Sequence, residues 1–321
     1  MTKLGYQIPN FTYPGVDSHG LFDVVAMQAK AADRSGFDTV LLMDHFYQLP
    51  GLGAPDNAMI ECYTLLAALA QHTERVRLSA LVTGNTYRNP TLLAKTVTAL
   101  DVVSHGRAQL GIGAGWYELE HDSLGYEFGT FTDRFERLEE ALQIIIGMFR
   151  GERPSLAGQR YTVHEALNSP APVGRIPIMI GGAGERKTLR MAAQYADESN
   201  LICAVEDIPR KLAALDAHCD RLGRDRSQVT VTYQTSACIA PTHEQAQREA
   251  DDAVARIPQL AGRRASVIAG SPEEVAAAYE RILATGVDGV TVNLPANGHV
   301  EGRVALLGET LAPLIGQPGA R

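Results

Sequence analysis

The stretch Ala108-Gln-Leu-Gly-Ile-Gly-Ala-Gly-Trp-Tyr-Glu118 decides the fold, because an apolar strand runs directly into a glycine cluster and then into aromatic and acidic residues. Glycine lacks a Cβ, so Gly111, Gly113 and Gly115 would let the backbone approach a bound ring closely. Three other predicted strands also end in polar or glycine-rich residues, at 41–45, 79–85 and 178–184. Parallel α/β barrels build their active sites at the C-terminal ends of the strands, so this pattern indicates an enzyme.

Strand and helix signals alternate along all 321 residues. Continuous apolar runs are typical of strands covered on both faces, and segments with apolar residues at helical spacing separate them. The expected strands are 4–8, 39–43, 76–82, 108–112, 176–180, 199–203, 229–239 and 287–294. Eight strands alternating with helices match a (β/α)8 TIM barrel, and a doubly wound open sheet is the alternative.

Two segments interrupt the alternation. Residues 152–175 are rich in glycine and proline and predict an excursion over the C-terminal mouth of the barrel. Residues 258–272 predict a second, long connection, and long loops in compact domains tend to be functional. We therefore expect a single barrel domain over residues 1–321 with these two insertion segments.

Composition narrows the class of protein. A formal net charge of −8 argues against a general nucleic-acid binder, and no apolar run is long enough for a membrane span. The four cysteines show no Cys-x-x-Cys spacing, so we expect reduced thiols and no metal site. The sequence also starts without the apolar stretch of a signal peptide. These features predict a cytoplasmic protein that acts on a small molecule, with neither nucleic acid nor membrane as partner.

Polar side chains follow the ends of two of the expected strands. Asp44 and His45 follow the strand at 39–43, and an imidazole is the usual side chain for proton transfer near neutral pH. Neighbours on a strand point to opposite faces, so the two need not interact, and a loop cap with a rim histidine is the structural alternative. Thr83 and Asn85 would hydrogen-bond the polar edge of a ligand, whereas Arg88 is expected to be a structural bridge.

The segment Gly181-Gly-Ala-Gly-Glu-Arg-Lys-Thr188 follows a strand and opens a helix. Free backbone N–H groups and the helix dipole suit a phosphate there, and Arg186 adds positive charge. The segment matches neither the Walker nor the Rossmann pattern, and a tight turn with solvated charges is the alternative. Trp116, beyond the other glycine cluster, is expected either to stack on a substrate or to fill the core.

Four motifs together resemble the bacterial luciferase-like superfamily, and within it the coenzyme F420-dependent oxidoreductases: Leu42-Met-Asp-His-Phe46, Gly111-Ile-Gly-Ala-Gly-Trp116, Arg134-Phe-Glu-Arg-Leu-Glu-Glu140 and Gly181-Gly-Ala-Gly-Glu-Arg-Lys-Thr-Leu189. The resemblance covers residues 4–295 in the family's order. It implies a barrel that holds a flavin-like tricycle over its mouth, with a non-prolyl cis peptide behind the ring near Leu81–Val82. It departs at Trp116, where the family's sugar-phosphate dehydrogenases carry a glutamate, so Glu118 or Glu120 is the expected substitute.

The resemblance also implies roles for individual residues. His45 and Glu118 are the expected catalytic residues, with His45 beside the reacting carbon. The expected cofactor-binding residues are Asp44, Leu81, Val82, Thr83, Asn85, Gly115, Gly181, Gly182, Ala183, Gly184, Arg186 and Asn200. Relatives of this kind are often dimers, so a homodimer is expected.

Three functions follow from these residues. The first is hydride transfer between the deazaflavin coenzyme F420 and an unidentified organic substrate. The second keeps the fold but uses FMN, as a luciferase-like monooxygenase that reacts with oxygen. The third is a non-catalytic protein that binds a deazaflavin or flavin.

Overall fold

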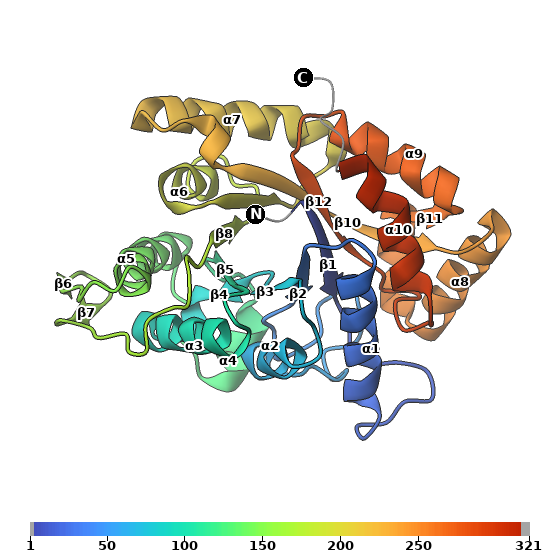
Figure 1. Ribbon diagram of the computed structural model, residues 1–321, viewed down its shortest axis with the longest axis horizontal. Coiled ribbons are helices and arrows are strands. Elements are labelled where there is room, and N and C mark those ends of the chain that lie inside the picture. Colours follow the sequence, from blue (N-terminus) through green and yellow to red (C-terminus); the bar gives the residue numbers. More distant parts are fainter. Residues whose placement is uncertain (1–2, 316–321) are drawn as a thin grey trace.

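A closed barrel of eight parallel strands forms the centre of the computed structural model, which describes residues 3–315 (Figure 1). The barrel strands are β1 (Leu4–Ile8), β2 (Thr39–Leu42), β3 (Arg77–Ala80), β5 (Ala108–Gly113), β8 (Ile178–Gly181), β9 (Glu198–Leu201), β10 (Thr230–Ile239) and β12 (Gly289–Asn293). Each pairs in parallel with the next, and β12 closes the ring by pairing with β1. The predicted (β/α)8 TIM barrel is therefore confirmed, and the open sheet is excluded.

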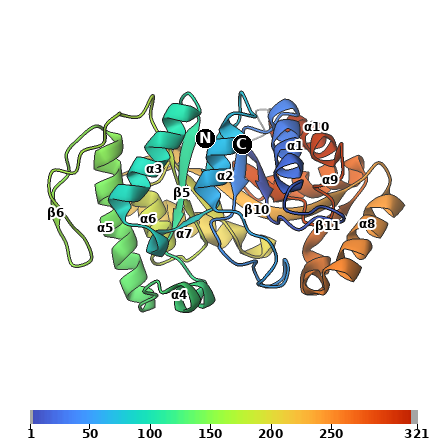
Figure 2. The ribbon, with the colours of Figure 1, turned by 90° about the horizontal axis from the view of Figure 1, so that it is seen from below.

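Helices surround the barrel and bury their apolar faces against it (Figures 1 and 2). They are α1 (Leu21–Arg34), α2 (Cys62–Ala70), α3 (Pro90–Val103), α5 (Phe131–Phe149), α6 (Thr188–Tyr195), α7 (Ile208–Leu222), α9 (Pro272–Leu283) and α10 (Arg303–Ile315). The helix α5 begins where Thr130 and Asp133 form a capping box, which satisfies two otherwise free N–H groups. The helix α3 begins with Pro90, whose fixed φ suits a first helical position.

The remaining strands and helices lie outside this alternation of barrel strands and surrounding helices. They are β4 (Thr83–Gly84), η1 (Asn85–Tyr87), α4 (Glu118–Leu124), β6 (Leu156–Ala157), β7 (Thr162–Val163), η2 (Val205–Asp207), η3 (Arg226–Gln228), α8 (His243–Arg256), η4 (Pro258–Ser266) and β11 (Val267–Gly270). The strand β11 was not expected from the sequence. It pairs with the last four residues of β10, which is ten residues long and extends past its barrel neighbours.

The excursion at 152–175 does not cover the mouth, and that prediction is wrong. Its β6–β7 hairpin lies beside α5 on the outside of the barrel (Figure 1), where the Glu140 carboxylate accepts three backbone N–H groups from residues 159–161. Asn168 ties the rest of the segment to Thr98 of α3 through a side-chain hydrogen bond of 2.8 Å. Polar bonds to the two outer helices therefore hold the segment away from the strand ends. The second excursion, at 258–272, does reach the mouth.

Two searches of residues 3–315 gave negative results. None of the helices there combines the length and apolar character needed to cross a membrane. In the same part of the chain, histidine, cysteine and acidic side chains form no group of three that would hold a metal ion. The four cysteines are free thiols, as expected.

Candidate active site

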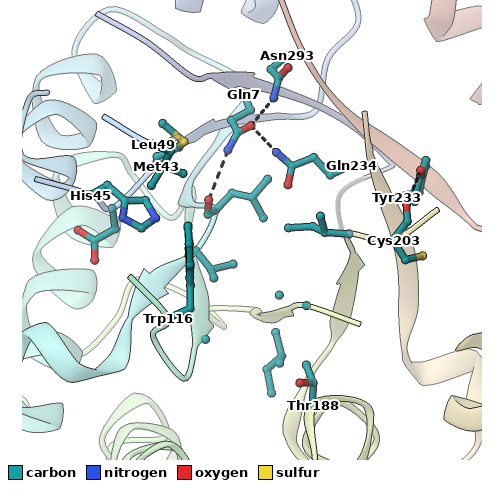
Figure 3. A pocket seen from close by; sticks show the side chains of 18 of the residues that line it. Gln7, Met43, His45, Leu49, Trp116, Thr188, Cys203, Tyr233, Gln234 and Asn293 are labelled. Atoms are coloured by element: carbon teal, nitrogen blue, oxygen red, sulfur yellow. Dashed lines mark hydrogen bonds between the residues drawn. The ribbon is translucent and has the colours of Figure 1, made fainter. Parts of the chain in front are cut away.

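A cavity of about 990 Å³ opens at the C-terminal ends of the barrel strands (Figure 3). Residues of β1, β5, β8, β10 and β12 line it, together with the segments that follow β2, β3 and β9 and residues of η4. This is the end of the barrel where TIM-barrel enzymes place their active sites. The volume is typical of a site for a cofactor or small molecule.

Asp44 is fully buried at the end of β2 and forms a two-point ion pair with Arg88, with nitrogen–oxygen distances of 2.6 and 2.9 Å. The backbone N–H of Gly84 also donates to this carboxylate at 3.3 Å. Burial raises the pKa of Asp44, and the Arg88 charge offsets only part of that rise. Arg88 also binds Glu61 at 2.6 Å, so it bridges three segments, as the sequence predicted.

His45 makes a different contact from its neighbour. Its Nδ1 lies 2.9 Å from Oε2 of Glu120, a fully buried side chain on α4. Oε1 of the same carboxylate accepts the backbone N–H groups of Phe46 at 2.5 Å and Tyr47 at 2.9 Å, and the Tyr87 hydroxyl donates to Oε2. Burial raises the pKa of Glu120, but the hydrogen bonds from His45, Tyr87 and the backbone outweigh it and leave the pKa below its usual value.

The tautomer of His45 follows from this arrangement. An ionised carboxylate only accepts hydrogen bonds, so Nδ1 of His45 must carry the proton that points to Glu120. Nε2 is then the ring nitrogen left for a ligand, and His45 lies on the cavity wall (Figure 3). Glu120 therefore orients the imidazole, as carboxylates do in hydrolytic triads.

Glu118 does not occupy the position expected of a catalytic residue. It is exposed at the first position of α4 and is not among the residues that line the cavity. Of the two glutamates offered by the sequence, Glu120 is the one that contacts His45. Trp116 lines the cavity with 59% of its surface exposed, which excludes a role in filling the core. Its ring meets that of His45 edge-on at 5.8 Å between centroids.

The peptide bond between Leu81 and Val82 is cis, as the resemblance implied, and both residues line the cavity. Glycines at the ends of β5 and β8 make room for this segment. A Cβ on Gly113 would lie 2.9 Å from a Val82 methyl group, and one on Gly181 would lie 2.7 Å from the other. Val82 therefore occupies a cradle that a side chain at either glycine would fill. The Thr83 hydroxyl, also on the wall, pairs with Tyr63 at 2.6 Å.

Two residues expected to bind the cofactor lie away from the cavity. Asn85 is fully buried and does not line the cavity, and neither the nitrogen nor the oxygen of its side-chain amide has a hydrogen-bond partner in the part of the chain that the structure describes. Asn200 points into the barrel interior, where its amide donates to the hydroxyls of Thr232 at 2.9 Å and Thr291 at 3.0 Å. The predictions for these two residues are corrected accordingly.

The loop between β8 and α6 divides the predicted phosphate-binding residues. Gly181 and Gly182 line the cavity, whereas Ala183, Gly184 and Arg186 do not; Gly115, which follows β5 and was expected to bind the cofactor, also lines it. The helix α6 starts at 188, and the backbone N–H groups of 183–187 have no backbone acceptor within residues 3–315. Arg186 is exposed next to them. The loop thus combines free donors with a cation, the features that favour an anion.

Sequence reasoning missed an amide cluster on the cavity floor (Figure 3). Oε1 of Gln7 accepts hydrogen bonds from Gln234 at 2.6 Å and from Asn293 at 2.8 Å, and Nε2 of Gln7 donates to the Leu81 carbonyl oxygen at 3.4 Å. The cluster therefore connects three strands to the cis segment. The available signal was a polar residue inside each of three apolar strands, at 7, 234 and 293.

Comparison with known proteins identifies the family to which this chain is similar. The family model described as "Luciferase-like monooxygenase" matches residues 2–286. An F420-dependent glucose-6-phosphate dehydrogenase from Microbacterium testaceum is 34% identical over 67% of this chain and 64% of its own length, just under two thirds of that protein. An FMNH(2)-dependent dimethylsulfone monooxygenase from Pseudomonas fluorescens is 24% identical over 89% of this chain and 85% of its own length.

Solved structures agree on the fold. A coenzyme F420-dependent tetrahydromethanopterin reductase from Methanopyrus kandleri superposes with a TM-score of 0.78 at 18% identity, covering 98% of this chain and 99% of that one. The monooxygenase RslO1 from Streptomyces bottropensis superposes with a TM-score of 0.80 at 19% identity, covering 97% and 98%. At these identities the likeness concerns the barrel alone.

Proposed function

The chain belongs to the luciferase-like monooxygenase family, and on this premise we propose that it is an oxidoreductase that transfers a hydride between coenzyme F420 and a small organic substrate. The observation that carries the proposal is His45, held by Glu120 on the wall of a cavity of about 990 Å³. The relative from Microbacterium testaceum, named as F420-dependent, supports this choice of cofactor.

The residues present fit a deazaflavin. The cis segment Leu81–Val82 offers an apolar surface on which a flat ring would lie, and the glycines at 113 and 181 leave the space in which Val82 packs. The loop after β8 would hold the phosphate, with free N–H groups and Arg186. When bound, the deazaflavin supplies a carbon that accepts or donates a hydride in a two-electron step.

In this proposal, side chains of the protein accept and return the proton that accompanies hydride transfer. Oxidation of a hydroxyl compound to a carbonyl compound would give up a hydride to the bound deazaflavin and a proton from the hydroxyl group, and Nε2 of His45 would accept that proton. The reverse reaction returns both. Glu120 stabilises the imidazolium formed in this step, because its carboxylate faces Nδ1 at 2.9 Å. Trp116 covers the cavity beside His45 and helps to exclude water. We assign no role to Glu118.

His45→Asn tests this proposal. The variant keeps a donor toward Glu120 but removes the proton acceptor, so F420 should still bind while hydride transfer falls by about 10²- to 10⁴-fold. Binding is measured by equilibrium titration, and turnover by the absorbance of oxidised F420. Unchanged turnover would refute the proton role of His45.

FMN-dependent oxygenation is the second candidate function. The dimethylsulfone monooxygenase relative supports it, since its match extends over 89% of this chain. Oxygen consumption by the FMN-loaded protein distinguishes the two candidates, because hydride transfer to or from a deazaflavin consumes no oxygen.

We also propose that the protein is a homodimer and that it is cytoplasmic. Sedimentation of the purified protein tests the oligomeric state, and cell fractionation tests the location.

A further inference from the structure

Few charged side chains line the cavity, and most of them already interact with other groups of the protein. Five of its lining residues carry an acidic, basic or imidazole side chain: Asp44, His45, Arg134, Glu206 and Arg263. Asp44 is neutralised by an ion pair with an arginine, and His45 belongs to the Glu120 network. The guanidinium of Arg134 donates to two backbone carbonyl oxygens, at 3.1 and 2.9 Å, and lies 3.9 Å from the centre of an aromatic ring.

The two remaining charges have opposite signs. Glu206 on η2 and Arg263 on η4 are both exposed at the rim. The aliphatic part of Arg263 packs on Gly51, where it lies 2.9 Å from the position of a Cβ. A phosphate dianion in the cavity would therefore find among these two lining residues one cation, Arg263, and one carboxylate, Glu206. Phosphate sites are typically built from several converging donors, so this rim does not match a phosphorylated substrate.

Large apolar side chains occupy the rest of the rim. Trp116, Phe131 and Ile202 line the cavity and are 59%, 58% and 58% exposed. They come from three different parts of the chain, after β5, at the start of α5 and after β9. Apolar side chains that are exposed and gathered around a cavity mark a place where an apolar ligand is buried.

We propose that the substrate is an uncharged alcohol or carbonyl compound with an apolar ring or branched alkyl body, and not a phosphate ester or other dianion. The reacting oxygen lies at His45, and the apolar body lies against Trp116, Phe131 and Ile202. This inference rests on the proposed function, because the substrate's hydroxyl or carbonyl carbon is the partner in hydride transfer.

The test compares an alcohol with its one-methyl homologue, with its own phosphate ester and with a sugar phosphate. The full chain, saturated with reduced F420, which cannot accept a hydride from an alcohol, is titrated by calorimetry with cyclohexanol, 4-methylcyclohexanol, cyclohexyl phosphate and glucose 6-phosphate. One more buried carbon should tighten binding by about fourfold. The phosphates should bind at least tenfold more weakly than cyclohexanol.

A matched pair of variants locates the ligand. Ile202→Asp places a charge on the apolar rim and should weaken 4-methylcyclohexanol binding by about tenfold. Leu222→Asp makes the same change at an exposed leucine on α7 outside the cavity, and should leave binding unchanged. Trp116 is the only tryptophan, so its fluorescence reports the same titrations in the cofactor-free chain.

Each outcome has a stated meaning. Preference for the alcohols, with the methyl-group gain and the Ile202→Asp loss, supports the proposal. Tighter binding of either phosphate, or no binding of any alcohol to the F420-saturated chain, overturns it. Failure of F420 itself to bind refutes the proposed function instead, and the ligand preference is then decided by the fluorescence of Trp116.

Discussion

Replacing Glu120 with glutamine should invert the tautomer of His45. The wild-type carboxylate accepts hydrogen bonds from Nδ1 of His45, the Tyr87 hydroxyl and two backbone N–H groups. A glutamine oxygen is able to keep the two backbone bonds, which leaves the amide NH₂ facing His45 and Tyr87. Since NH₂ only donates, Nδ1 must become an acceptor and the proton moves to Nε2.

The size of the effect follows from the bonds that change. Hydrogen bonds to charged groups contribute about 1.5–3 kcal/mol each, and two of them are replaced by weaker, rearranged bonds. We expect Glu120→Gln to lower the free energy of unfolding by about 2–4 kcal/mol. The folded variant should lose about 10²- to 10⁴-fold in hydride transfer, because Nε2 no longer accepts the proton.

The assay combines denaturant unfolding, turnover per folded protein and ¹⁵N NMR of labelled histidine, with His45→Asn used to assign the signal. Glu118→Gln is the matched control, the same change two residues away on the same helix but at an exposed side chain. It should alter stability by less than about 0.5 kcal/mol and leave turnover intact. A turnover loss in Glu118→Gln without one in Glu120→Gln would refute the reasoning.

Three further predictions concern the same framework. The pKa of Glu120 is lowered in the folded chain, so the stability that the ionised carboxylate adds is complete above the ordinary value of 4.5 and is lost as the pH falls through the folded value. The difference in the free energy of unfolding between wild type and Glu120→Gln should therefore shrink below about pH 4.5. Unfolding curves recorded at a series of pH values measure it. Gly111→Ala would put a Cβ 1.9 Å from a backbone carbonyl oxygen and should lower the free energy of unfolding by about 3 kcal/mol or more in denaturant unfolding. At Gly262 a Cβ would meet no atom within 4 Å, so Gly262→Ala should change the free energy of unfolding by about 0.5 kcal/mol or less. Arg88→Met should lower the free energy of unfolding by about 3–5 kcal/mol, measured by thermal unfolding, because it leaves Asp44 buried without its ion pair. Adding Asp44→Asn should recover part of that loss. Equal stability of the single and the double variant would contradict the ion-pair account.

The sequence predicted the barrel because its strands are apolar runs buried on both faces. All eight expected strands are present, with ends that differ by a few residues. The strand β11 escaped prediction because it pairs only with the part of β10 that extends past the barrel, and its residues are mostly half-buried. The excursion at 152–175 was misplaced because its position depends on hydrogen bonds to α3 and α5, which sequence spacing does not encode.

The site was harder to predict, because it depends on where side chains point. Glu118 and Glu120 lie about 200° apart around a helix of 3.6 residues per turn, so only one faces His45, and the rotation of α4 decides which. Asn85 and Asn200 follow or end strands, as expected of ligand-binding residues, yet Asn85 is buried away from the cavity and Asn200 points into the barrel interior. A position near a strand end is visible in sequence, whereas the direction of the side chain is set by packing.

Equilibrium binding of oxidised F420 and, separately, of FMN to the purified full chain tests the central claim most directly. Both titrations are followed by cofactor fluorescence, with Trp116 as a second reporter inside the cavity. The proposed function predicts that F420 binds and that FMN binds much more weakly. Tight FMN binding with weak F420 binding would contradict it and assign the cavity to a flavin monooxygenase.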